Sequence, residues 1–416
     1  MFIKMLLAAF VLFAFGIASA AFDDDFIRKA TEIGDALESS SNNELAVILE
    51  AEKLQEKYKE DSQALQILSQ YTATYYSIVA DHKNALIAAD TNASIPKDET
   101  FEISGYFQTD AIQTILNRSD ETQVVMINEA HHIAQHRVLS IRLLKGLYNK
   151  GFRFLALEGM GSYIYPYSPP LLDNHGYYTN EPVFSMLIKT AEEMGFEIVS
   201  YDGASSTIKM REHLSAKNLK ARIFDKNSKA KVLIHVGYSH INEDTWLAAE
   251  INDLLDINPL TVSQTKIREK SHTKFEVALY DVLLAKKQSD EPFVLINQNQ
   301  EIWSSNPEKW DIDVIWPRTI YSNDKPKWMT LGREQIKIPN LLCNNTYPCF
   351  VEVFHGRVAP NRDIESLTAH DKTIVRDSKN VSTILLMHGE NTILAKDANN
   401  MVINRIEGSF KKLKEM

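Results

Sequence analysis

The sequence predicts an α/β protein with a central, mostly parallel sheet and flanking helices, preceded by a helical region and followed by a small β-rich domain. Between about residues 105 and 320, short apolar segments such as VVMIN and VLIHV alternate with stretches of helical length. These segments are apolar at consecutive positions, as burial of both faces of a parallel sheet requires. Four of them also end in, or are followed by, acidic or histidine residues, which predicts a site at one edge of the sheet.

The first twenty residues are typical of a cleavable export signal. Lys4 precedes an apolar run over residues 5–17, and the small residues Ala18, Ser19 and Ala20 follow it. The run is short for a membrane span, so a retained anchor is the weaker alternative. We therefore expect a secreted or periplasmic protein. No second stretch of about 18 apolar residues occurs in the sequence, so we expect no stable membrane insertion of the mature chain.

Residues 21–98 are expected to form a helical region. Apolar side chains recur three and four positions apart over residues 24–90, and Ala, Leu, Glu and Lys are abundant there. The turn-forming residues of the segment 90–98 separate this region from the next.

Residues 99–330 are expected to form the α/β domain. The predicted strands are 124–128, 152–158, 197–202, 232–237, a strand around Val262, and 293–297. The predicted helices are 133–149, 181–194, 206–224 and 243–255, and the segment 276–285 extends the alternating pattern.

Residues 331–416 are expected to form an antiparallel β-rich domain. Short strand-like runs such as FVEVF and TILAK are separated there by Asn, Asp and Gly. The only two cysteines, Cys343 and Cys349, lie in this domain. In an exported protein they are expected to form a structural disulfide, worth about 2 kcal/mol for so short a loop. A metal site would need more ligands than the nearby His355 supplies.

The charge balance argues against some partners. The formal net charge is −10, with 45 basic and 55 acidic side chains. Nucleic acid is therefore not expected as a partner. We expect a small molecule, a peptide or haem instead.

The first candidate site residues follow the strand 124–128. Glu129, His131 and His132 lie on the turn after that strand, and His136 lies one helical turn further on. His132 and His136 are four apart and are expected to share a helix face. Imidazole and carboxylate groups together can bind a divalent metal or transfer protons near neutral pH.

The other candidates follow later strands. Glu158 and Asp202 end two of them, His235 lies within a third, and His240 follows it. If the strands that end in Glu129 and Glu158 are neighbours, the two carboxyl groups would interact and acquire different pKa values. Asp202 as a turn residue and His235 as a core histidine are the alternatives that the sequence leaves open.

This part of the chain resembles the superfamily of ChaN-like haem-binding uptake proteins, Tiki/TraB proteins and erythromycin esterase-like hydrolases. Those families have a G-E-x-H or G-E-x-x-H motif after the first strand, which Glu129 and either His131 or His132 match. Glu158 matches the Glu that ends their second strand, and His136 matches a further His of the ChaN-like pattern. The segment Gly237-Tyr238-Ser239-His240 matches the later Gly-x-x-His element of Tiki-type proteins.

The resemblance covers about residues 120–245, and Asn128 departs from it where the families have Gly. It implies either a hydrolase or a haem-binding protein. In the first case Glu129, His132, Glu158 and His240 would be catalytic, with water activated directly or through a divalent metal. In the second, haem or iron would be held without catalysis. For a metal or haem, the expected ligands are His131, His136, Asp202 and His235.

Substrate contacts are expected from Arg137, Tyr238 and the aromatic loop after Glu158, which contains Tyr163, Tyr165 and Tyr167. Arg211 is a further candidate for holding an anionic group, although solvated helix faces are the commoner place for Arg. A third interpretation, suggested by Asn128, is an interaction protein whose site has lost its chemistry.

Overall fold

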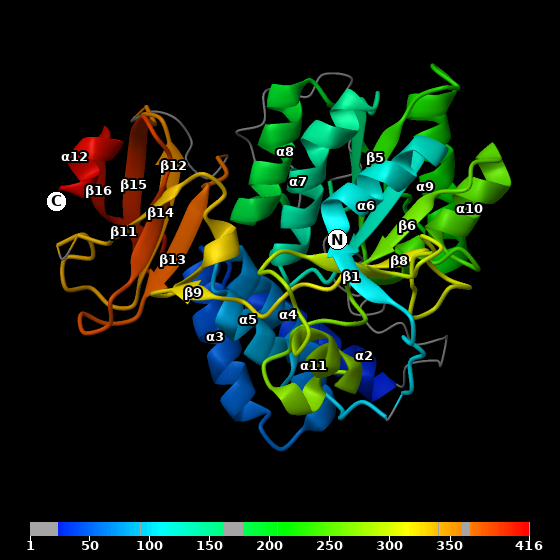
Figure 1. Ribbon diagram of the computed structural model, residues 1–416. Coiled ribbons are helices and arrows are strands. Elements are labelled where there is room, and N and C mark those ends of the chain that lie inside the picture. Colours follow the sequence, from blue (N-terminus) through cyan, green and yellow to red (C-terminus); the bar gives the residue numbers. More distant parts are fainter. Residues whose placement is uncertain are drawn as a thin grey trace.

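Figure 1 shows the computed structural model of the protein, which confirms the predicted α/β class with its helical and β-rich flanks. The structure describes residues 24–91, 93–97, 99–160, 178–205, 207–339, 341–359 and 367–415. The predicted signal segment and Tyr163, Tyr165 and Tyr167 lie outside these residues.

A six-stranded parallel sheet forms the centre, in the order β4-β3-β5-β2-β6-β8. Its strands are β2 (Val124–Glu129), β3 (Phe154–Leu157), β4 (Glu197–Ser200), β5 (Val232–Gly237), β6 (Leu260–Ser263) and β8 (Ile312–Asp313). The strands that lead to Glu129 and Glu158 are not neighbours, because β5 lies between them. The condition for pairing those two carboxylates, namely adjacent strands, is therefore not met. The predicted strand at 293–297 is β7 (Phe293–Ile296), which pairs antiparallel with β1 (Phe107–Asp110) outside this sheet.

Helices cover both faces of the sheet (Figure 1). On one face, α6 (Ala111–Arg118), α7 (Gln135–Asn149) and α8 (Pro182–Met194) pack on side chains such as Val125 and Ile127. On the other face, α9 (Ile208–Leu219) and α10 (Leu247–Leu255) pack on Val124 and Met126. Alternate residues of one strand thus enter different cores, which explains why the strand sequences are apolar throughout.

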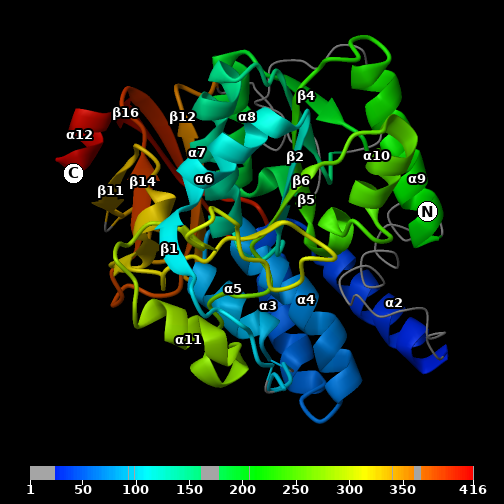
Figure 2. The same cartoon turned by 45° about the vertical axis from the view of Figure 1, so that its right-hand side comes forward.

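The helical region consists of α2 (Asp24–Ser39), α3 (Glu44–Lys57), α4 (Ser62–Ile78) and α5 (His82–Ala89), as predicted. Figures 1 and 2 both show α3, α4 and α5 beneath the sheet and next to the β-rich region. Leu86 of α5 packs on Ala130, Ile133 and Tyr238, which follow β2 and β5. The helical region therefore adjoins the carboxyl edge of the sheet. The short helix α11 (Ala278–Leu284) lies beside it in both views.

The C-terminal region is antiparallel, as predicted. Its four-stranded sheet has the order β13-β12-β15-β16, and β11 pairs with β14. The elements are β9 (Tyr321–Ser322), β10 (Lys325–Pro326), β11 (Glu334–Lys337), β12 (Cys349–His355), β13 (Asp371–Val375), β14 (Thr383–Leu386), β15 (Glu390–Lys396), β16 (Val402–Ser409) and α12 (Phe410–Lys414). The predicted disulfide between Cys343 and Cys349 is present.

One buried lysine joins the three regions. Lys372 of β13 contacts Glu44 of α3 at 2.6 Å and Asn180, which precedes α8, at 2.7 Å. Among the helices of the described residues, none is both long and apolar enough to cross a membrane.

Candidate functional site

The candidate residues form two ion-pair networks at the carboxyl edge of the sheet. In the first network, Arg137 of α7 binds Glu129 with two donors, Nε at 2.6 Å and Nη2 at 2.7 Å. Its Nη1 donates to Glu181 at 2.8 Å. All three side chains are almost completely buried. Arg137 thus lies between two carboxylates inside the protein, where it neutralises charges that burial would otherwise penalise heavily.

The carboxylate of Glu129 also contacts two imidazoles. The Nδ1 of His131 is 2.9 Å from its Oε1, and the Nε2 of His235 is 2.8 Å from its Oε2. Ser140 is 2.9 Å from the other ring nitrogen of His235. Burial acts to raise the pKa of Glu129, but Arg137, His131 and His235 outweigh it and hold this pKa well below its usual value. Glu129 is therefore a charged anchor for the rings around it.

The second network surrounds Glu158. The Nη2 of Arg211 is 2.9 Å from Glu158 and 3.1 Å from Asp202. His240 contributes its Nε2 to Glu158 at 3.2 Å and its Nδ1 to Glu212 at 2.7 Å. The backbone N–H of Gly159 donates to Asp202 at 2.7 Å. Three strand ends and α9 thus bring five ionisable side chains together.

The two strand-end carboxylates of this second network have opposite pKa shifts. Burial acts to raise the pKa of Glu158, but His240 and Arg211 hold it well below its usual value. Burial raises the pKa of Asp202, and the charge of Glu158 adds to this against the opposing effect of Arg211. Burial acts to lower the pKa of His240, but Glu212 and Glu158 raise it to about 10. The two carboxyl groups whose pKa values are shifted apart are therefore those of Glu158 and Asp202, which follow the adjacent strands β3 and β4.

The two networks meet above Gly237, the last residue of β5. A Cβ at this position would lie 2.5 Å from Nε2 of His131 and 2.9 Å from Oε2 of Glu158. The backbone N–H of Gly237 also donates to Glu158. The missing side chain therefore allows an imidazole and a carboxylate to approach the same small volume.

His131 lies between two tyrosines. Its ring stacks on Tyr178 with a centroid distance of 4.3 Å, and it meets Tyr238 edge-on at 5.3 Å. Its side chain is 14% exposed, as is that of Arg211, and Asp202 is 19% exposed. These three side chains are the ones through which the networks approach the surface of the described part of the protein.

His132 and His136 lie apart from the two carboxylate networks. The helix begins at Gln135, so His132 precedes it, and the prediction that the two rings share a helix face was wrong. The Nδ1 of His136 accepts the backbone N–H of Ala130 at 3.0 Å, while His132 faces the hydroxyl of Tyr238 at 3.3 Å. Of the two histidines that match the motif, His131 is therefore the one that contacts Glu129.

A metal ion does not fit the donors as they are arranged. Both oxygens of Glu129 face Arg137, and Glu158 faces Arg211 and His240. Within the described ranges, no three His, Cys, Asp or Glu side chains are placed to hold an ion. Two guanidinium groups occupy the positions that a cation would need, so we derive no step through a metal.

Several partners in the networks had no clear signal in the sequence. Glu181 caps α8 by accepting from the N–H groups of Val183 and Phe184, and Glu212 lies in the helix α9. Arg211 was a candidate for holding an anionic group, and its partners are the carboxylates of Glu158 and Asp202. One feature of the sequence could have indicated these partners. Arg211 and Glu212 are adjacent on the helix that precedes β5, the strand before His240.

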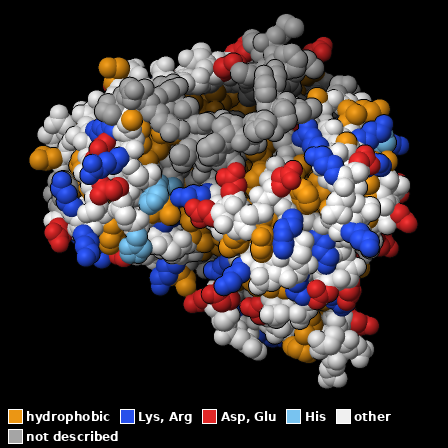
Figure 3. Space-filling view, turned by 90° about the horizontal axis from the view of Figure 1, so that it is seen from above, with side chains coloured by type: hydrophobic (Ala, Val, Ile, Leu, Met, Phe, Trp, Pro, Cys, Tyr) orange, Lys and Arg blue, Asp and Glu red, His pale blue; other side chains and the backbone are white. Residues whose placement is uncertain are grey.

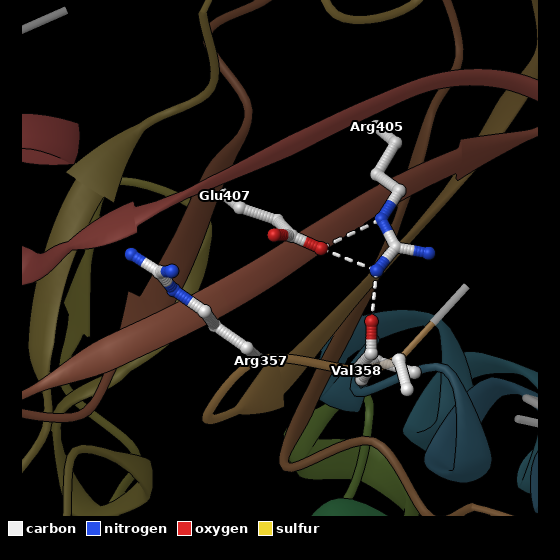
Figure 4. Close-up of a pocket in the computed structure, with 5 residues that line it drawn as sticks. Arg357, Val358, Arg405 and Glu407 are labelled. Carbon is white, nitrogen blue, oxygen red and sulfur yellow. Dashed lines mark hydrogen bonds and ion pairs between the residues drawn. The ribbon is translucent and has the colours of Figure 1, made fainter. Parts of the chain in front are cut away.

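The described surface also has a hollow. The hollow lies on the β-rich region and is lined by Arg357, Val358, Ala359, Arg405 and Glu407. Figure 4 shows Arg405 directed at Glu407 and at the carbonyl of Val358, so its charge is already compensated. On the described part of the face in Figure 3, basic and acidic side chains are interspersed.

Comparisons with known proteins leave the family open. No family model and no curated protein matches the sequence. Two solved structures show some likeness. The type III effector HopBA1 is 12% identical with a TM-score of 0.27, over 53% of this chain and 98% of that chain. A structure described as "Bacterial protein toxins" is 15% identical with a TM-score of 0.26, over 62% and 53%. Scores this low support no argument, so the superfamily resemblance stays a prediction.

Proposed function

We propose that this chain is an exported hydrolase that activates water with His131 and protonates the leaving group with Asp202. The observation that supports it most is the placement of His131. Its Nδ1 is fixed by Glu129 at 2.9 Å, and its Nε2 approaches Glu158 over Gly237. A carboxylate that accepts the Nδ1–H of an imidazole leaves the other nitrogen as a base, which is the arrangement general base catalysis requires.

The proposed reaction is the hydrolysis of an ester or amide bond in a small molecule or peptide. His131 takes a proton from a water molecule as its oxygen attacks the carbonyl carbon. Asp202, whose pKa is raised by burial and by Glu158, donates a proton to the departing oxygen or nitrogen. Glu158 remains charged between Arg211 and His240 and positions the water. His240 holds Glu158 and so acts as a positioning residue.

The test is turnover of a panel of chromogenic esters and peptide amides by matched variants. His131→Gln and Asp202→Asn should each reduce kcat/KM by about 10²–10⁴-fold, the usual effect of removing a general base or acid. His213→Gln is the control, because His213 lies on the same helix as Arg211 but pairs with Glu250 of α10 rather than with a member of either network. Asp202→Asn should also remove the decline of activity at high pH, where the wild-type Asp202 loses its proton. Turnover that is unchanged in His131→Gln would exclude this mechanism.

The competing proposal is a haem- or iron-binding protein without catalysis. It requires an imidazole or tyrosine that can leave its present partner for iron. His235 and His136 are completely buried, which leaves His131 as the most accessible of the three expected imidazole ligands. Titration with haem decides between the two: a Soret shift in the wild type that is lost in His131→Gln would favour haem binding.

A further inference from the structure

A second group of polar side chains lies beside the carboxylate networks, where α5 adjoins the sheet. Asn128, at the end of β2, donates to the carbonyl of Tyr238 at 2.8 Å and to the hydroxyl of Thr265 at 3.1 Å. The Nε of Arg268 in turn donates to the carbonyl of Thr265 at 3.1 Å. Because Tyr238 contacts His132, these bonds bring Arg268 to the same strand end as His132.

Arg268 has no acidic partner among the described residues. It donates to the backbone carbonyls of Thr265 and Glu269, at 3.1 and 3.4 Å, which leaves most of its five N–H donors unused. The neighbouring Asp90 is already occupied, since it binds Lys270 at 3.1 Å and the backbone N–H of Ser271 at 2.7 Å. The guanidinium therefore has no direct carboxylate partner in the described chain, and Asp90 acts on it only from a distance.

His132 supplies an independent observation. Its side chain is 7% exposed, and its Nε2 is buried without a hydrogen-bond partner in the described structure. Burial, followed by the charges of Arg268 and Lys270, holds the pKa of His132 well below its usual value, so the ring is neutral. When the hydroxyl of Tyr238 donates to Nδ1, the proton of the neutral ring lies on Nε2. An N–H donor left without an acceptor in this way costs about 1–3 kcal/mol.

We propose that Arg268 and His132 form a binding site for a small oxyanion, the carboxylate or phosphate group of a ligand. One oxygen would accept from Nε2–H of His132, and the guanidinium of Arg268 offers the two parallel donors that such groups bind. Lys270, paired with Asp90, lies at the rim of this site, where its side chain is 23% exposed. Arg268 itself is partly exposed, so the site is accessible from solvent. This site goes beyond the proposed hydrolase and stands without it.

The test is titration of the full chain with inorganic phosphate and, separately, with acetate, at ionic strength held constant with potassium chloride. The ring resonances of His132, identified by their loss in His132→Gln, should shift in a saturable way. A response to phosphate alone would identify phosphate esters as the ligand class, and a response to acetate alone would identify carboxylates.

Two variants that remove one positive charge separate a site from general attraction. Arg268→Gln should weaken binding at least tenfold. Lys266→Gln, two positions away and paired with Glu99, should not change it. No saturable shift with either anion in the wild type, or equal weakening in both variants, would overturn the proposal. If Arg268→Gln does not fold, the proposed anion site is tested by the wild-type titration and by Tyr238→Phe. The latter variant removes the hydroxyl that contacts Nδ1 of His132.

Discussion

Replacing Gly237 with Ala should disturb both networks at once. The backbone of Gly237 has an ordinary φ of −82°, so alanine adds no backbone strain. The new methyl group would lie 2.5 Å from Nε2 of His131 and 2.9 Å from Oε2 of Glu158, closer than such atoms can approach. His131 cannot move aside freely, because it stacks on Tyr178 and binds Glu129. Overpacking of this kind costs about 1–3 kcal/mol.

Urea unfolding and the imidazole NMR resonances of His131 measure this effect. We expect a lower midpoint with an unchanged slope, and displaced His131 resonances. Gly34→Ala is the matched control, because Gly34 lies within α2 and the nearest neighbour of its added methyl is the Tyr71 hydroxyl at 3.9 Å. In a helix interior that substitution should stabilise by about 0.5–1 kcal/mol. A Gly237→Ala protein with wild-type stability and undisturbed His131 resonances would refute the reasoning.

Two further predictions concern the charged groups. Arg137→Met leaves Glu129 and Glu181 buried without their cation, so we expect a loss of about 3–5 kcal/mol in unfolding free energy. The exposed Arg28→Met should cause a far smaller loss. Similar losses in the two variants would contradict a buried anchor. His240 has a folded-state pKa raised from 6.5 to about 10, so its contribution is complete below pH 6.5 and disappears as the pH rises through 10. The stability difference between the wild type and His240→Gln should therefore shrink between pH 7 and 10.5, and a constant difference would disprove the assignment.

The strands, and the acidic and histidine residues at their carboxyl ends, could be predicted from the sequence because both are local properties. A strand buried on both faces must be apolar at consecutive positions, and residues such as Glu129 and Asp202 stand out where the apolar run stops. The order of the strands is not local. β5 follows β4 in the chain but enters the sheet between β3 and β2, and this placement depends on how the crossover helices pack.

The partners of the candidate residues were harder to predict than the residues themselves. Arg137 and Arg211 both lie on helices, where most arginines face water, and nothing in the local sequence distinguishes a buried one. Glu181 resembles any residue that caps a helix, although it also binds Arg137. Burial of such groups follows from tertiary packing, so it becomes visible only once the helices are placed on the sheet.

The insertion of β5 explains why two networks exist rather than one carboxylate pair. Glu129 is the register partner of Gly237 and lies on the face covered by α7, the helix that supplies Arg137. Glu158 follows Leu157 by one residue and so turns to the opposite face, where α9 supplies Arg211. Each carboxylate thus has its own arginine on its own side of the sheet. Side chains of the two networks can approach each other only beyond the end of β5, the strand between them, and that strand ends at Gly237. Glycine at this position lets His131 and Glu158 share the space above the strand end, so the conformation of His131 in Gly237→Ala reports on whether the two networks are in contact there.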